Sequence, residues 1–260
     1  FYYSTFLYAT HIVGGDFKID MVDNIGSGAT YDIQLRLYRD DVNGAVTLPS
    51  SVTVGIYYVG TNVQVTTKTI YLMSSGLVPL GDSCYTPNPV QVRIEEGVYQ
   101  NLGGSTVFLE NNSLGYYIQY ETCCRNNIVD NLQSPSTLGV SVFAKIPDPA
   151  LGQNSTPDFG AYPNDAYFCV NNIKQFSWPV TDIDGDSLVY SLLAPLDESG
   201  QSGFLADSGP ATGAYPTYPS CPFSFGYSAS NMIGGTPNMS IDAFTGVITA
   251  SPAIQGNVKV

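Results

Sequence analysis

The stretch "YDIQLRLYRD" (31–40) alternates apolar and polar residues with a period of two. Its apolar residues fall on one face and its polar residues on the other: Tyr31, Ile33, Leu35 and Leu37 against Asp32, Gln34 and Arg36. Successive side chains of a strand point to opposite faces of the sheet. The pattern therefore predicts a strand of an antiparallel sheet with one buried face.

The same alternation recurs along the first half of the chain, in residues 51–60, 63–72, 90–99, 115–124 and 137–146. Glycine, asparagine, aspartate or proline occupies nearly every gap between these segments, as is typical of turns. No segment has the apolar period of a helix. We therefore predict an all-β fold, and a β-sandwich within that class.

A break in the alternation divides the chain. Residues 147–159 are rich in proline and small polar residues, which is typical of a linker. A second series of strands is predicted at 165–172, 174–180, 187–193 and 238–250, the last of them a hairpin around the turn "DAFTG". We thus expect two tandem sandwich domains, at 10–147 and 159–260, joined by a linker at 148–158.

The two ends of the sequence suggest a fragment of a longer, exported polypeptide. The opening "FYYSTFLYA" (1–9) is apolar and uncharged and ends in a small residue, which predicts a signal-peptide remnant; the alternative is a first β-strand. Another strand begins at "QGNVKV" (255–260), so we expect the second domain to lack its closing strand.

The charge balance excludes some partners. The chain carries 22 acidic against 9 basic residues, a formal net charge of −13, which would repel nucleic acid. Such a surface suits divalent cations or simple solubility in an extracellular setting. No apolar run approaches the roughly 20 residues of a membrane helix, so a membrane-spanning chain is not expected.

The cysteines indicate an oxidising compartment. There are five, Cys84, Cys123, Cys124, Cys169 and Cys221, with no C-x-x-C pair and with His11 as the single histidine. A zinc site needs clustered cysteine and histidine ligands, so disulfides of a secreted protein are the better interpretation.

The segment "TDIDGDSLVY" (181–190) raises the possibility of calcium. Its glycine stands fourth, not sixth, and a strand-like run follows, so it is not an EF-hand loop. At most two of Asp182, Asp184 and Asp186 would face one ion easily where the backbone is extended. Calcium would therefore need further oxygen ligands, for which Asp158, Asn154 and Asp242 are the candidates. The alternative is that the aspartates accept backbone hydrogen bonds that fix a turn.

Several motifs resemble a known family. "DIDGDSLVYSL", "YSASNMIGG" and "SIDAFTGVITASP" resemble the immunoglobulin-like, cadherin-related modules of large Bacteroidota surface proteins. "THIVGGDF", "IQLRLYRD" and "YIQYETCCRNN" resemble the N-terminal region of the same proteins, which often carry a gliding-motility-associated or type IX secretion C-terminal domain. The resemblance covers most of residues 10–256 and implies a secreted, adhesin-like protein on the outer cell surface, with immunoglobulin-like sandwiches.

The resemblance also bears on the disulfides. Family members usually have a second cysteine where this chain has Arg93, and another where it has Leu193. If those two cysteines normally pair with one of the Cys123–Cys124 pair and with Cys169, the resemblance implies a rearrangement here, in which Cys84 could bridge one of the adjacent pair and Cys169 could bridge Cys221. Adjacent cysteines are not expected to bridge each other, because the geometry is strained.

Nothing in the sequence indicates an enzyme. A nucleophile would have to use His11 as its base, beside the expected signal cleavage site. Glu95 and Glu96 are neighbours on a strand and point to opposite faces, although a glycosidase pair from distant strands stays open. Phosphate-binding glycine loops are missing from the sequence, so no nucleotide or organic cofactor is expected.

Tyrosines provide the remaining candidates for ligand contact. Tyr215 and Tyr218 lie in a long loop, 197–220, that is rich in turn formers, while Tyr116, Tyr117 and Tyr120 are expected to pack in the sheet. We expect a non-catalytic module that serves surface attachment or acts as a structural spacer and contacts a surface glycan, a protein ligand or neighbouring domains of its own chain. The alternative is a carbohydrate-binding module of a secreted polysaccharide-processing protein.

Overall fold

The computed structural model describes residues 12–44, 46–79, 92–101, 106–163, 168–198, 218–235 and 238–253. Within these ranges the fold is all-β, as predicted. Strands carry nearly all of the regular structure, and the short 3-10 helices η2 (Pro135–Thr137) and η3 (Pro149–Leu151) lie before and after strand β8 (Gly139–Ile146). The described residues include no helix with the length and apolar character that a membrane span requires.

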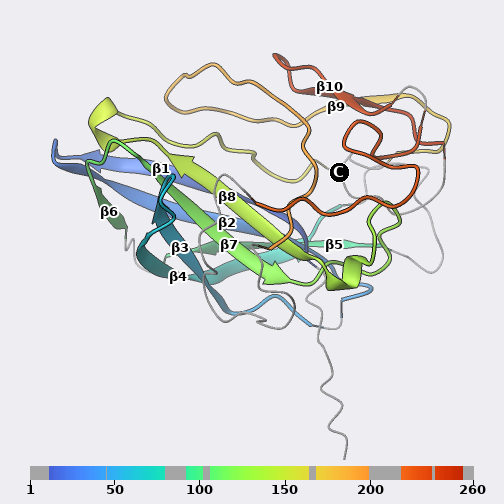
Figure 1. Cartoon of the computed structure of the whole chain (residues 1–260), viewed down its shortest axis with the longest axis horizontal. Helices are drawn as coiled ribbons and strands as arrows, with labels where there is room; N and C mark the ends of the chain where they lie inside the picture. The colour runs from blue at the N-terminus through green and yellow to red at the C-terminus, as the bar shows by residue number, and fades with distance from the viewer. Residues whose placement is uncertain are drawn as a thin grey trace, which may run out of the picture.

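A large antiparallel sheet forms the first part of the molecule (Figure 1). Besides β8 it contains β1 (Ile12–Asn24), β2 (Gly28–Asp40), β3 (Ser51–Tyr58), β4 (Gln64–Leu77), β5 (Ile94–Gln100), β6 (Val107–Glu110) and β7 (Tyr116–Cys123). The order is β1-β2-β5-β4-β3-β7-β8, and β6 pairs with β2. The two ends of this order meet, because the side chain of Val142 in β8 lies close to Gly15 in β1. The sheet thus wraps around one core.

The period-two pattern of β2 explains that core. Ile33, Leu35 and Leu37 are fully buried, together with apolar residues from all the other strands of the sheet. The opposite face of β2 is not simply solvent-exposed: Arg36 and Tyr38 are also buried there, which the alternation does not reveal. All the strands predicted between residues 31 and 146 are present, whereas β1 and β6 were not predicted.

A smaller sheet has the order β10-β11-β9, from β9 (Lys174–Ser177), β10 (Ser240–Ile241) and β11 (Val247–Ala250). It has its own core, which includes Phe176, Met232 and Ile248. In Figure 1, β9 and β10 lie apart from the strands of the large sheet. The predicted hairpin at 238–250 is confirmed, and the strand predicted at 174–180 is present but ends at Ser177.

Two other predicted strands of the second half differ from the structure. Residues 187–193 pair with no strand, although Leu188, Tyr190 and Leu192 are half-buried as their alternation suggests. Residues 168–172 of the segment predicted at 165–172 are a coil and a turn. Alternation reports which side chains face a core, but a strand also needs a partner with a matching row of backbone groups. The expected signal-peptide remnant, 1–9, lies outside the described residues.

The predicted linker, residues 148–158, lies along β1. Thr156 donates its N–H to the carbonyl oxygen of Ile19 over 2.9 Å and accepts the Ile19 N–H at its hydroxyl over 2.8 Å. Ser155 accepts the N–H of Met21 at its hydroxyl over 3.2 Å. The segment is thus hydrogen-bonded to the large sheet and is not a free tether. The division into two independently folding domains stays a prediction.

Candidate functional site

A cluster of charged side chains stands where the large sheet meets the chain that leads to the small sheet. This junction cluster consists of Asp16 and Lys18 on β1, Arg36 on β2 and Asp158. Arg36 lies between the two carboxylates: its Nε is 3.5 Å from Asp16 Oδ1, and its Nη2 donates to Asp158 Oδ1. Lys18 Nζ is 3.2 Å from Asp158 Oδ2. The cluster therefore ties Asp158 to both strands.

The two carboxylates of the junction cluster, Asp16 and Asp158, have pKa values that are shifted in opposite directions. Burial raises the pKa of Asp16 to about 6, although the Arg36 guanidinium and the Tyr38 hydroxyl favour the ionised form. Burial also opposes ionisation of Asp158, but the Gly160 N–H, Arg36 and Lys18 outweigh it and lower the pKa of Asp158 to about 2. Below about pH 6, Asp158 is thus the ionised carboxylate beside Arg36, and Asp16 joins it as pH rises to neutral.

These pKa shifts predict a pH dependence of stability. The contribution of Asp16 is fully present below its ordinary pKa of 3.8 and is lost as pH rises through about 6, because the folded state keeps a proton that the unfolded state has released. The contribution of Asp158 is present above 3.8 and is lost as pH falls towards 2. Urea unfolding at pH 4, 5, 6 and 7 should show stability falling with pH in the native protein and a weaker fall in Asp16→Asn. An equal fall in both proteins would contradict this assignment.

Aromatic side chains continue the junction towards β9. The ring of Tyr162 lies 5.1 Å from that of Tyr38 on β2 and 5.4 Å from that of Trp178, just after β9. Trp178 donates its indole N–H to the carbonyl oxygen of Phe159 over 2.7 Å, and its ring lies against the Phe159 ring. Packed rings thus connect the large sheet with the small one.

A second contact between the parts is made by the β7–β8 loop. Asn131, which is fully buried, donates its amide to the carbonyl oxygen of Met232 over 3.0 Å and accepts the Ser224 N–H at its backbone oxygen. Gln133 donates its N–H to the carbonyl oxygen of Pro222 over 2.9 Å. These bonds join residues about 90 to 100 positions apart, so they fix the loop against the second part of the chain.

The predicted ligand contact by Tyr218 does not fit its position. Tyr218 is buried, its ring stacks on Phe143 at 4.9 Å, and its hydroxyl donates to Gln119 Oε1 over 2.7 Å. It therefore packs on the large sheet, where a ligand would not reach it. Tyr215 lies outside the described residues. Tyr116, Tyr117 and Tyr120 are buried in the sheet, as the packing interpretation predicts.

The aspartate segment forms a turn. Asp182 Oδ1 accepts the N–H groups of Asp184 and Asp186, each over 3.0 Å. The turn binds the segment 148–158, since Asp184 Oδ2 accepts the Ser155 N–H over 2.5 Å and Asp186 Oδ2 accepts the Asn154 amide over 3.2 Å. These bonds fit the interpretation in which the aspartates fix a turn.

The candidate calcium ligands come together only in part. Asn154 lies beside the aspartates, but the Asp158 carboxylate faces Arg36 and Lys18. Asp242 caps its own hairpin, where its Oδ1 accepts the N–H groups of Phe244 and Thr245. The described part of the chain contains no group of three or more His, Cys, Asp or Glu side chains placed to hold a metal ion.

Calcium binding stays a prediction that thermal melting can check. If the aspartates only fix the turn, the melting temperature should be the same with calcium and with EDTA, and Asp182→Ala should lower it because two backbone N–H groups lose their acceptor. A rise in melting temperature with calcium that disappears in Asp184→Ala would instead favour the ion.

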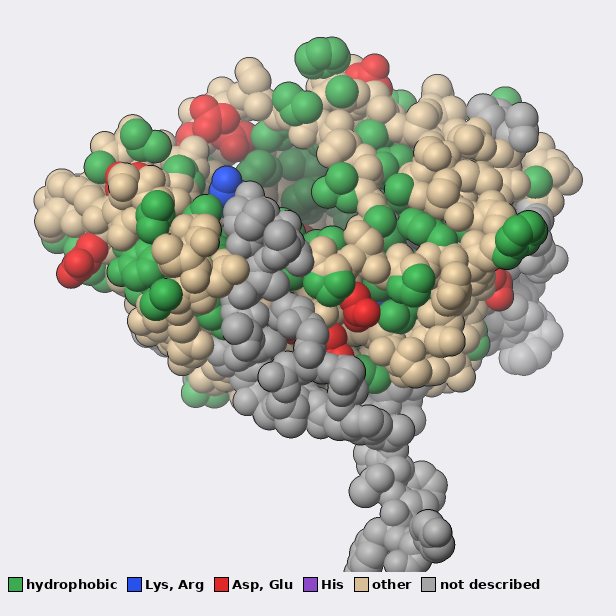
Figure 2. Space-filling model, in the orientation of Figure 1, with side chains coloured by type: hydrophobic (Ala, Val, Ile, Leu, Met, Phe, Trp, Pro, Cys, Tyr) green, Lys and Arg blue, Asp and Glu red, His purple; other side chains and the backbone are tan. Residues whose placement is uncertain are grey.

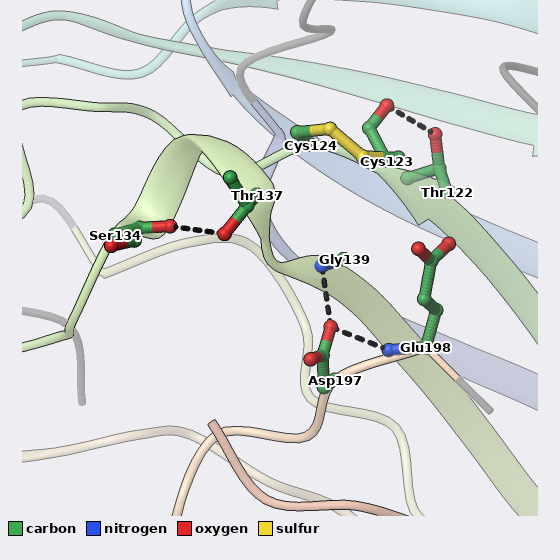
Figure 3. Close-up of a disulfide and its surroundings, with 8 residues drawn as sticks. All are labelled: Thr122, Cys123, Cys124, Ser134, Thr137, Gly139, Asp197 and Glu198. Carbon is green, nitrogen blue, oxygen red and sulfur yellow. Dashed lines mark hydrogen bonds between the residues drawn. A yellow bond between two sulfur atoms is a disulfide. The ribbon is translucent and has the colours of Figure 1, made fainter. Parts of the chain in front are cut away.

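The disulfides differ from the pairing expected from the sequence. Cys123 and Cys124 are bonded to each other at the end of β7, beside Gly139 at the start of β8 (Figure 3). Cys169 is disulfide-bonded, whereas Cys221 carries a buried thiol, so the expected Cys169–Cys221 bridge is wrong. The expected bridge from the adjacent pair to Cys84 is also wrong, because the pair bridges itself; Cys84 lies outside the described residues.

A peptide map under non-reducing conditions would check this arrangement. The peptide that contains Cys123 and Cys124 should be lighter than its reduced form by the mass of two hydrogen atoms. Cys221 should react with a thiol reagent only after unfolding, because it is buried. Alkylation of both Cys123 and Cys124 in the folded, unreduced protein would contradict the bond.

Sequence reasoning missed the junction cluster apart from Asp158. Arg36 stands on the polar side of a predicted strand, where exposure is the ordinary expectation, and Asp158 is 122 positions away in the chain. No local signal pairs them. A weak signal was the scarcity of basic residues, 9 in the whole chain, which makes any arginine within a strand a candidate for a specific ion pair.

The fold and these contacts define an all-β protein whose two parts share an extensive junction. Comparisons of the chain with family models, with curated proteins and with solved structures find no match.

Proposed function

We propose that the chain is a non-catalytic module of a secreted cell-surface protein, in which it acts as a stiff spacer in surface attachment. The main support for this proposal is that residues 148–158 form hydrogen bonds to β1 on one side and to the aspartate turn on the other. Ser155 and Thr156 bond to β1 through their hydroxyls, and the N–H of Ser155 bonds to the aspartate turn. A segment held from both sides gives the two parts a defined relative position, which a spacer needs.

The disulfides support the extracellular setting. Cys123, Cys124 and Cys169 are all oxidised, and such bonds persist in secreted and cell-surface proteins. The distribution of charge is compatible with this setting: Figure 2 shows acidic side chains at separate places on one face, where they outnumber the basic ones. The resemblance of "YIQYETCCRNN" to bacterial surface proteins agrees with both points.

Limited proteolysis tests the stiffness of the junction. Proteinase K should leave residues 148–158 uncut in the native protein, because their backbone groups are bonded to both neighbours. Mass spectrometry of the fragments would locate every cut. Early cleavage within 148–158, with both halves resistant afterwards, would show a flexible tether and contradict the spacer.

Antibody labelling of intact cells tests the location. A polyclonal antibody against the chain should stain cells whose envelope is unbroken, and protease treatment of those cells should remove the signal. Staining that needs permeabilised cells would contradict a surface role. The alternative of a carbohydrate-binding module cannot use Tyr218, which is buried.

A further inference from the structure

The small sheet has one buried and one open face. Phe176 on β9 and Ile248 on β11 lie opposite each other and point into its core. Gln175, Thr249 and Ser240 lie opposite one another across the three strands, one position along from that apolar row, and therefore point the other way. The open face of the sheet is thus a row of amide and hydroxyl groups.

A shallow hollow of about 410 Å³ occupies this face. We call it the polar hollow; its lining includes Gln175, Ser240, Asp242, Thr245, Val247 and Thr249. The hairpin turn that supplies Asp242 and Thr245 also carries Phe244 between them, and this ring is 83% exposed. The rest of the lining comes from paired strands, so a ligand would meet a platform that is already in place.

Several polar atoms of the hollow have unused hydrogen-bonding capacity. Asp242 Oδ1 accepts from the backbone of Phe244 and from Thr245, whereas its Oδ2 has no partner among the described residues. Gln175 donates its amide to Thr249 Oγ1 over 3.1 Å, which leaves its carbonyl oxygen available. Ser240 contributes an exposed hydroxyl.

We propose that the polar hollow binds a neutral carbohydrate. Sugar hydroxyls would donate to Asp242 Oδ2 and to the Gln175 carbonyl oxygen and would exchange hydrogen bonds with Ser240, while an apolar sugar face would lie on the exposed Phe244 ring. The hydrogen bonds of the turn lower the pKa of Asp242, so it is ionised and disfavours anionic ligands. A single carboxylate among hydroxyls and an amide lacks the oxygen ligands that calcium requires. The site goes beyond the spacer role and does not depend on it.

The test is an NMR titration of the ¹⁵N-labelled full chain with hexasaccharides of defined type. Cellohexaose, xylohexaose, mannohexaose and laminarihexaose are the neutral probes, and hexagalacturonic acid is the anionic one. At least one neutral probe should shift the amide signals of residues 175 and 240–249, and hexagalacturonic acid should shift none of them. Absence of shifts with every neutral probe, or shifts confined to other residues, would overturn the proposal.

Variants make the assignment specific. Phe244→Ala should weaken binding about tenfold, the loss expected for one aromatic contact, and Gln175→Ala should weaken it as well. Phe225→Ala is the matched control, because Phe225 is also an exposed phenylalanine in a turn, but its turn, unlike that of Phe244, supplies no residue that lines the hollow. All three residues are exposed, so the folded state should persist in each variant, as amide spectra would show. Equal losses in Phe244→Ala and Phe225→Ala would also overturn the site.

Discussion

Replacing Arg36 by methionine should lower the free energy of unfolding by about 3–5 kcal/mol, the range found when one partner of a buried ion pair is removed. The Arg36 side chain is only 7% exposed and lies between the carboxylates of Asp16 and Asp158. Methionine fills most of the volume but leaves Asp16 without its cation. Urea unfolding at pH 7, where Asp16 is ionised, measures the loss.

Arg93→Met is the matched control for Arg36. Arg93 forms a two-pronged ion pair with Asp41, but its side chain is 41% exposed. Water and salt screen such a pair, so its removal should change stability little. If the two variants lost equal stability, the junction cluster would have no special role in joining Asp158 to the large sheet.

Tyr218→Ala should destabilise the protein by about 3–5 kcal/mol, as expected for deleting a buried aromatic side chain. The ring stacks on Phe143 of β8, and the hydroxyl donates to the amide oxygen of Gln119, which is fully buried on β7. Tyr218→Phe should cost less, about 1–3 kcal/mol, because it keeps the ring and leaves one buried acceptor without its donor.

The two Tyr218 variants also separate a packing role from a ligand role. A surface residue that contacts a ligand would leave the urea midpoint unchanged when it is replaced. We expect the urea midpoints of both variants to fall, and that of Tyr218→Ala to lie below that of Tyr218→Phe. Unchanged midpoints would mean that Tyr218 is exposed in solution and would restore it as a candidate for ligand contact.

The sequence was most informative where side chains face a single core. The buried residues Ile33, Leu35 and Leu37 recur at every second position and predict β2 directly. Phe17, Ile19 and Met21 have the same spacing and are buried in β1, so the pattern for the missed strand was present in the sequence. Residues 187–193 alternate equally well and still pair with no strand. Alternation therefore records burial, and the pairing of backbones has to be learned from the structure.

The junction was not predictable for a different reason. Its contacts join residues that are far apart in the chain, such as Tyr218 to Gln119 over 99 positions and Arg36 to Asp158 over 122. Nothing local distinguishes Arg36 from an ordinary exposed residue on the polar side of a strand. The aspartate turn was recognised as one of two alternatives, but its attachment to Ser155 depends on folding that brings the two segments together. The polar hollow likewise forms only when Gln175 meets Thr249 across paired strands.

The coverage of β1 has a consequence for copies of the molecule at high local concentration. An open outer strand presents unsatisfied amides and carbonyls to which a strand of another copy can add, the first step of amyloid-like aggregation. Here the hydroxyls of Ser155 and Thr156, with the Thr156 backbone, already occupy these groups at Ile19 and Met21. Removing both hydroxyls would therefore make neighbouring copies prone to stick to one another before it impaired the fold of any single copy.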